Sequence, residues 1–186
     1  MGNSIKRTNP GDAANIFIRC FLSDISELMG GFSKNDLHKT MEYFDYCCPY
    51  TGEDLKTKYV NDDYVLDHLI PHNREYCGLH VFGNIIPTTR IVNSKKASLP
   101  FEQFIMTDTT VLGNISNEER VLRILKLKEF QKSAGYEEKI LHIDKIKEIC
   151  ENEYQCILTK CKENKNRIKE MIQSKEIVSS LVRNLT

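Results

Sequence analysis

The residues that could do chemistry are concentrated between Cys48 and Lys96. An Asp-His pair, Asp67 and His68, lies within the run YVLDHLIP, and two asparagines follow at Asn84 and Asn93. Carboxylate and amide oxygens suit a hard cation such as Mg²⁺ or Mn²⁺. A neutral imidazole, with an ordinary pKa of about 6.5, can take a proton from water. A bound cation and a deprotonated water together serve metal-assisted hydrolysis, so residue types of this kind predict that class of chemistry.

Cations gather around the same segment. Residues 84–100 carry Arg90, Lys95 and Lys96 and no acid. The whole chain has a formal net charge of zero, from 26 basic and 26 acidic residues, which argues against binding of nucleic acid by bulk charge alone. The local excess of positive charge is therefore the feature that predicts a bound phosphate, next to the proposed site.

The loop after the Asp-His pair carries further polar candidates. His72 and Arg74 are candidates for contacts to a nucleic-acid backbone, although an ion pair of Arg74 with Glu75 or another neighbour is an equal alternative. His72, Cys77 and His80 could also form a transition-metal cluster with the Asp-His pair. Their spacing fits no zinc family, so we favour contacts with solvent or phosphate.

These motifs resemble the HNH nucleases, also called the ββα-metal family. That pattern has an Asp-His pair at a strand end, an Asn in the loop, and a second Asn or His on the next helix. The resemblance covers about Cys48 to Met106, roughly a third of the chain. The HNH domains of RNA-guided CRISPR nucleases carry C-x-Y-[ST]-G-K before the pair and P-[FY]-E after the last motif, and CPYTGE and LPFEQF occupy those places here.

The resemblance assigns a role to each matching residue. It implies that His68 is the general base, that Asp67 and Asn93 bind a single Mg²⁺ or Mn²⁺, and that Asn84 orients the loop and the base. Lys96, three residues after Asn93, would then meet a phosphate oxygen. The fold implied is a ββα module.

Zinc is not expected. Many HNH proteins carry two C-x-x-C pairs that hold a structural zinc, and the first would lie at Cys48 and Thr51. Only one sulfur is present there, and after Cys77 the next cysteine is Cys150. The sequence therefore predicts no structural zinc.

Helical patterns lie on the N-terminal side of this segment. Residues 12–29 have helical apolar spacing, with Asp12 as a possible N-cap and a Gly-Gly pair at the end. A second helix is expected from Ser33, which forms a relaxed capping box with Asp36. The apolar faces expected to be buried are Ile16, Phe17, Phe21, Ile25, Leu28 and Met29 in the first helix and Leu37, Met41 and Phe44 in the second.

The central segment, residues 47–100, has short apolar runs broken by Pro and Gly. A strand is expected over DYVLDHLI and should end at Pro71. A loop through Asn84 then leads to a helix that begins near 89–92 and holds Asn93 and Lys96 one turn apart. SLPFEQFI predicts one more short helix, with Ser98 as its cap.

The C-terminal third is helical and highly charged. Ser116 and Glu119 form a capping box, and the core stripe expected after it is Val121, Leu122, Leu125 and Phe130. A long helical run from Glu137 carries a seam at alternating steps of three and four: Tyr154, Ile157, Cys161, Asn164, Ile168, Met171, Lys175, Val178 and Val182. Two interpretations remain open, a coiled-coil or dimer contact and packing against the chain's own helices.

The fold class expected is α+β, mostly helical with a central ββα-metal (HNH) module. We divide the chain into an N-terminal helical arm (1–46), the nuclease module (47–106) and a C-terminal helical region (107–186). A chain of 186 residues can bury a core without disulfides. Seven cysteines without framework spacing and a start without an apolar segment favour the cytoplasm, and no run is long enough to span a membrane.

The function expected is a metal-dependent DNA endonuclease, and family habit favours bacterial restriction or antiviral defence. One alternative is a non-catalytic nucleic-acid-binding or scaffold subunit of a defence complex. Another is a non-specific nuclease toxin that a partner holds inactive. The partners expected are DNA and, through the C-terminal helices, a second copy or a partner protein.

Overall fold

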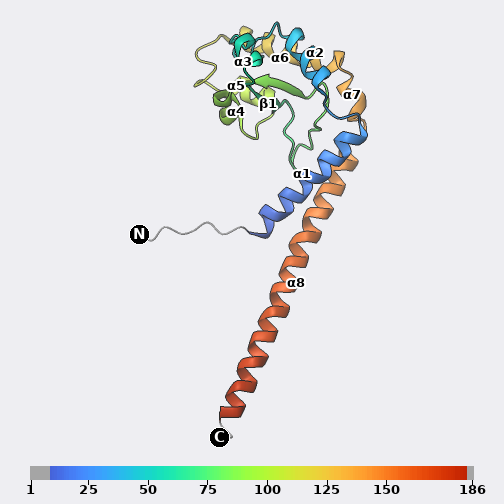
Figure 1. The fold of residues 1–186 in the computed structure, drawn as a ribbon, viewed down its shortest axis with the longest axis vertical. Coiled ribbons are helices and arrows are strands. Elements are labelled where there is room, and N and C mark those ends of the chain that lie inside the picture. Colours follow the sequence, from blue (N-terminus) through green and yellow to red (C-terminus); the bar gives the residue numbers. More distant parts are fainter. Residues whose placement is uncertain (1–8, 184–186) are drawn as a thin grey trace.

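The structure is a computed structural model that describes the backbone of residues 9–183 and the side chains of residues 9–175. The described chain is mostly helical, with one small antiparallel sheet, so the α+β class is confirmed at that level. Figure 1 shows a body from which one long helix projects. The elements are α1 (Pro10–Leu28), α2 (Lys34–Tyr43), α3 (Lys56–Val60), β1 (Val65–His68), β2 (Ile85–Thr88), α4 (Arg90–Lys96), α5 (Phe101–Thr107), α6 (Asn117–Ser133), α7 (Tyr136–Lys139) and α8 (Ile143–Arg183).

Both N-terminal helices begin where side chains can satisfy their free N–H groups. Asn9 caps α1, and Asp12 bonds back to the cap's backbone, so Asp12 is the partner in the capping box rather than the predicted cap. Ser33 and Asp36 form the predicted capping box of α2. Helix α1 gives way to Gly30 and Gly31, both with positive φ.

The buried face of α1 agrees with the prediction only in part. The buried side chains are Ala14, Ile18, Leu22 and Ser26. Phe21 and Ile25 are half-buried and pack against the same core, as predicted, whereas Ile16, Phe17, Leu28 and Met29 are exposed. The packing of α1 along α8 decides which side of the helix is buried.

Strands β1 and β2 pair antiparallel, and α4 follows directly. Asp67 lies opposite Ile86, and His68 lies opposite Ile85. Strand β2 is buried throughout because α2 packs against it, while α4 packs against β1. The Thr89 hydroxyl accepts a hydrogen bond from the backbone N–H of Val92 and so starts α4. The order strand, strand, helix agrees with the pattern predicted, and its identity as an HNH module stays a prediction.

One hydrophobic core joins all three predicted regions. Phe44 from the end of α2, Leu69 beside β1, Phe104 of α5, and Leu127 and Phe130 of α6 belong to the same buried cluster. Residues on both sides of the predicted boundaries at 46/47 and 106/107 thus share one core. The sheet and α4 are held against a helical layer that the C-terminal region supplies.

The predicted core stripe of α6 is wrong apart from Phe130. Val121, Leu122 and Leu125 are exposed, and Leu127 is buried instead. Only one side of α6 faces the body, where it packs against α5, so the orientation of this helix depends on its neighbours and not on its own pattern.

Helix α8 has two different halves. Its first half packs along α1 and buries Ile146 and Cys150 (Figure 1). From residue 162 to residue 175 every side chain is exposed, including the seam residues Ile168 and Met171. The predicted seam therefore packs on the chain's own helices only near its start. Val178 and Val182, the last predicted members of the seam, lie outside the described side chains.

Among the residues that the structure describes, no helix has both the length and the apolar character needed to cross a membrane.

Candidate functional site

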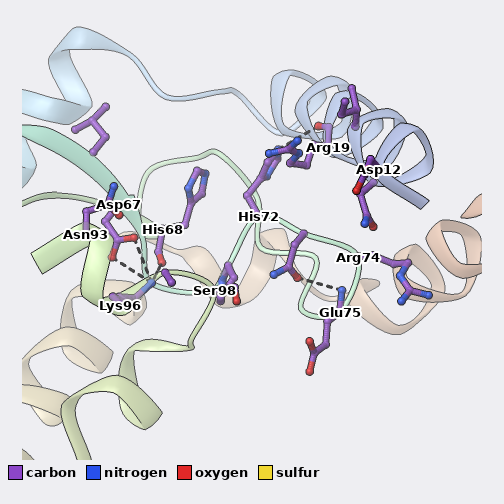
Figure 2. A pocket seen from close by; sticks show the side chains of 16 residues that line it. Asp12, Arg19, Asp67, His68, His72, Arg74, Glu75, Asn93, Lys96 and Ser98 are labelled. Carbon is purple, nitrogen blue, oxygen red and sulfur yellow. Dashed lines mark hydrogen bonds and ion pairs between the residues drawn. The ribbon is translucent and has the colours of Figure 1, made fainter. Parts of the chain in front are cut away.

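An open cleft of about 770 Å³ lies between α1 and the β1–α4 unit. In Figure 2, Asp67, Asn93 and Lys96 lie together on one side, Asp12 and Arg19 lie on α1 on the other side, and His68 and His72 stand between them. The residues that line the cleft are Asp12, Asn15, Ile16, Arg19, Leu66, Asp67, His68, Pro71, His72, Asn73, Arg74, Glu75, Asn93, Lys96, Ala97 and Ser98. The predicted residues Asp67, His68 and Asn93 thus share one cavity.

Asp67 is held at the base of the cleft by two partners. Its side chain is 5% exposed and accepts a hydrogen bond of 2.7 Å from the Tyr50 hydroxyl. The Lys96 ammonium lies 3.2 Å from Asp67 Oδ1. Burial raises the pKa of the Asp67 carboxyl, and Lys96 and Tyr50 oppose that shift. The arrangement fixes the carboxylate, because both partners stabilise its charged form.

Lys96 lies inside the protein rather than at a surface. Its ammonium donates to the backbone oxygen of His68 at 2.6 Å as well as to Asp67, and only 1% of its side chain is exposed. Burial lowers the pKa of Lys96, while Asp67 opposes the shift. In place of the predicted phosphate contact, the structure gives this cation two partners within the protein.

His68 ends β1 and is surrounded by two other imidazoles. Its Nε2 lies 3.1 Å from Nδ1 of His80, and its ring stacks on His72 with ring centres 5.0 Å apart. Burial, followed by the neighbouring histidines and Lys96, lowers the pKa of His68 to about 3. His68 is therefore neutral at physiological pH, and its pKa lies well below the value near 7 that suits a general base best.

Asn84 organises the loop between the strands, residues 69–84. Its Oδ1 accepts from the backbone N–H of Ile70 at 2.8 Å. Its Nδ2 donates to the backbone oxygens of Ile70 and Leu79, at 3.0 and 2.8 Å. Asn84 is completely buried, so it acts on the site through the backbone and does not reach the cleft itself.

Helix α4 presents its polar residues in two directions. Asn93 is half-buried and lines the cleft, whereas Arg90 and Lys95 are exposed. Both cations lie within one turn of Asn93 along α4, but neither is among the residues that line the cleft. The contact of these two residues to phosphate stays a prediction.

Arg74 and His72 are both engaged in the described chain. Arg74 makes an ion pair of 2.6 Å with Glu151 and lies over the Tyr154 ring at 3.9 Å. His72 Nδ1 is 2.8 Å from the backbone oxygen of Gly78, and its Nε2 is 3.1 Å from that of Arg19. The sequence had offered an ion pair as an equal alternative for Arg74, and the partner found is Glu151 rather than Glu75.

Asp67 and Asn93, the predicted metal ligands, both line the cleft. Both carboxylate oxygens of Asp67 already have partners within the protein, Tyr50 on Oδ2 and Lys96 on Oδ1. Oxygen ligands of this kind are those that Mg²⁺ prefers, and Mg²⁺ usually takes one or two carboxylates and completes its shell with water and phosphate. The described residues contain no set of three His, Cys, Asp or Glu side chains placed to hold a metal. The pair of Asp67 and Asn93 has only one side chain of these four types and so does not make such a set. The Cys77 sulfur bonds to the backbone oxygen of Arg74, away from the imidazoles.

Three residues of the site were not predicted. Tyr50 holds Asp67, His80 contacts His68, and Arg19 reaches the cleft from α1. Tyr50 lies in the motif CPYTGE, which could have pointed to it. His80 had been considered only as a metal ligand, and no sequence pattern links Arg19 to a site more than forty residues away.

The chain matches no protein-family model, no curated protein and no solved structure.

Proposed function

We propose that the chain is a metal-dependent endonuclease of the HNH type that hydrolyses DNA phosphodiester bonds. The observation that carries the proposal is the meeting of Asp67, His68 and Asn93 on one cleft. His68 ends a strand, and Asn93 lies on a helix 25 residues later in the chain. The fold, and not the sequence alone, therefore brings them together.

The proposed chemistry divides the work among these side chains. His68, neutral because its pKa is lowered to about 3, takes the proton of the attacking water. Asp67 and Asn93 hold the cation, which would neutralise charge on the phosphate and the leaving oxygen. Lys96 and Tyr50 keep the Asp67 carboxylate in place. Cleavage of this type leaves a 5′ phosphate and a 3′ hydroxyl.

Three cations are proposed to contact the nucleic-acid backbone. Arg19 lines the cleft from α1, and Arg90 and Lys95 are exposed on α4. Phosphate contacts of this kind position a duplex without reading its sequence. Lys96 belongs to the residues that hold the site together. His72 and Arg74 remain proposed contacts to the substrate, which would have to displace their present partners within the protein.

Cleavage of supercoiled plasmid DNA with Mg²⁺ or Mn²⁺ tests the proposal. The wild type should nick or cut the plasmid, EDTA should stop the reaction, and His68→Ala should lose at least about 100-fold in rate. His142→Ala is the matched control because His142 is exposed and lies outside the cleft. A wild type as inert as His68→Ala would favour a non-catalytic binding or scaffold subunit.

Asn93→Ala tests the metal role separately. This variant should lose metal-dependent cleavage and keep the helical circular dichroism of the wild type, since alanine is a good helix former. Asn152→Ala, at an exposed position of α8, should change neither. Unchanged turnover of Asn93→Ala would contradict the ligand assignment.

The biological setting proposed is bacterial restriction or antiviral defence in the cytoplasm. All seven cysteines are unpaired, which is compatible with a reducing compartment. A defined cutting pattern in the plasmid assay would favour restriction, whereas indiscriminate degradation would favour a nuclease toxin.

A further inference from the structure

A second imidazole lies behind His68. His80 Nδ1 is 3.1 Å from His68 Nε2, and His80, unlike His68, is not among the residues that line the cleft. The ring edge of His68 that carries Nε2 therefore meets a residue that does not line the cleft. The two nitrogens of an imidazole point in diverging directions, so Nδ1 of His68 is turned away from His80.

The structure holds His80 firmly. Its backbone N–H donates to the Ser26 hydroxyl at 2.8 Å, and that hydroxyl donates to the backbone oxygen of Leu22 at 2.6 Å. The Phe32 ring packs edge-to-face against the His80 ring, with centres 5.8 Å apart. Helix α1 therefore fixes the position of His80, which in turn meets the edge of His68.

The stacking of His72 restricts the same ring from another direction. The planes of His68 and His72 differ by 18°, and His72 is itself tied to the backbone oxygen of Gly78. His68 is thus held on its face by His72 and on its edge by His80. This double restraint matters for a general base, because a half-turn of the ring about its Cβ–Cγ bond would put Cδ2 in the place of Nδ1.

We propose that His80 is a positioning residue that accepts a hydrogen bond from Nε2–H of His68 and so leaves Nδ1 of His68 as the proton acceptor. The contact needs one N–H and one lone pair, so one of the two rings must be the donor. If His68 donates, its Nδ1 keeps a lone pair. The reverse arrangement would place the proton on Nδ1 and remove the base. The inference rests on the proposed nuclease function for its purpose, but not for its geometry.

The tautomer of His68 can be measured without any activity. Long-range ¹H–¹⁵N correlation spectra of the metal-free protein at pH 7.5 distinguish a protonated nitrogen from an unprotonated one in each histidine. The wild type should show His68 protonated at Nε2, and His80→Leu should show a mixture of the two tautomers. His68 protonated at Nδ1 in the wild type would overturn the proposal, and so would an unchanged tautomer in His80→Leu.

Rescue by asparagine separates positioning from packing. The Oδ1 of asparagine can occupy the place of His80 Nδ1 and accept the same hydrogen bond, whereas leucine only fills space. Plasmid cleavage should fall about 10- to 100-fold in His80→Leu, as for other groups that orient a functional histidine, and recover largely in His80→Asn. Equal losses in the two variants would show a packing role and overturn the proposal.

The two proposals can fail independently. An inert wild type whose His68 is protonated at Nε2 would remove the nuclease function and leave the role of His80 in fixing the tautomer supported. An active wild type whose His68 is protonated at Nδ1 would do the reverse. If His80→Leu does not fold, the wild-type spectrum and His80→Asn still decide the matter.

Discussion

Asp67 and His68 are adjacent in the chain, yet their surroundings are opposite in character. Asp67 is anchored by an ammonium and a phenol, which both favour its charged form. His68 is surrounded by imidazoles and by burial, which favour its neutral form. Burial favours the neutral form of both groups and raises the pKa of Asp67, so it is Lys96 and Tyr50 that stabilise the Asp67 carboxylate beside a neutral imidazole.

The low pKa of His68 predicts a loss of stability in acid. The histidine of the unfolded chain titrates near 6.5, and the folded one near 3, so below pH 6.5 the unfolded chain binds more protons. His68 should therefore lower the free energy of unfolding as the pH falls from 6.5, by up to about 1.4 kcal/mol per pH unit. Urea unfolding in EDTA at pH 7, 6 and 5 measures this slope.

His68→Gln is the control for that slope. Glutamine does not titrate, so the variant should lose less stability than the wild type between pH 7 and pH 5. His72 and His80 contact His68, so the difference between the two slopes reports His68 together with its coupling to these two imidazoles. Parallel curves would mean that folding leaves the pKa of His68 near its ordinary value of about 6.5.

At the residue scale, the sequence indicated the chemistry but not the contacts. Asp67, His68 and Asn93 were predicted to meet, and they line one cleft. The hydrogen bonds of Asp67 to Tyr50 and of His68 to His80 span 17 and 12 residues, and no local pattern encodes such a pair. Lys96 was assigned to a phosphate because position alone cannot show which way a long side chain turns.

At the scale of elements, the loop between β1 and β2 determines where the imidazoles lie. Asn84 binds its backbone at Ile70 and Leu79, and the backbone oxygen of Gly78 holds His72. Gly78 N–H also donates to the backbone oxygen of Pro71 at 2.9 Å. The loop folds back on itself so tightly at Gly78 that no side chain fits there.

Gly78→Ala should therefore distort the loop. A Cβ at this position would lie 1.9 Å from the backbone oxygen of Ile70 and 3.0 Å from Asn84 Nδ2. We expect the free energy of unfolding to fall by roughly 3 kcal/mol, as is usual for overpacking against backbone. Plasmid cleavage should fall with it, because His72 loses its anchor. Urea unfolding and the plasmid assay measure the two effects.

Gly113→Ala is the control for backbone strain alone. Gly113 has a φ of +65° but no atom near the place of a Cβ, so alanine there should cost about 1–2 kcal/mol and leave cleavage unchanged. If Gly113→Ala proves the more damaging substitution, the close approach at Gly78 does not constrain the loop.

Two helix starts were predictable, whereas two other caps and several buried faces were not. Asn9 caps α1 in place of Asp12, and α5 begins after Pro100 without a side-chain cap from Ser98. Ser33 and Ser116 cap their helices as the sequence indicated, because a cap is a contact between residues three positions apart. The buried faces of α1 and α6 depend on α8 and α5, which the sequence does not place. Both helices carry large apolar residues on more than one side, so the apolar pattern alone did not identify which side is buried.

At the scale of the whole molecule, α8 connects the cleft to a projecting arm. Its first half supports the loop through the contacts of Arg74 with Glu151 and Tyr154 and through buried Cys150. Its exposed stretch, residues 162–175, has Lys162, Lys165, Arg167, Lys169 and Lys175 against Glu163 and Glu170. A homodimer or a partner protein along this stretch stays a prediction, and excess positive charge opposes the pairing of two copies side by side.

Shortening α8 separates its two halves. A chain that ends at Lys165 loses side chains that are exposed as far as residue 175, so its free energy of unfolding should stay within about 0.5 kcal/mol of the wild type and cleavage should persist. A chain that ends at Glu148 loses Cys150 and both partners of Arg74, and should lose several kcal/mol, roughly as for the removal of core side chains. Urea unfolding and the plasmid assay compare the two. If ending at Lys165 abolished cleavage while stability held, the arm would be part of the substrate-binding surface, and the cleft alone would not account for DNA binding.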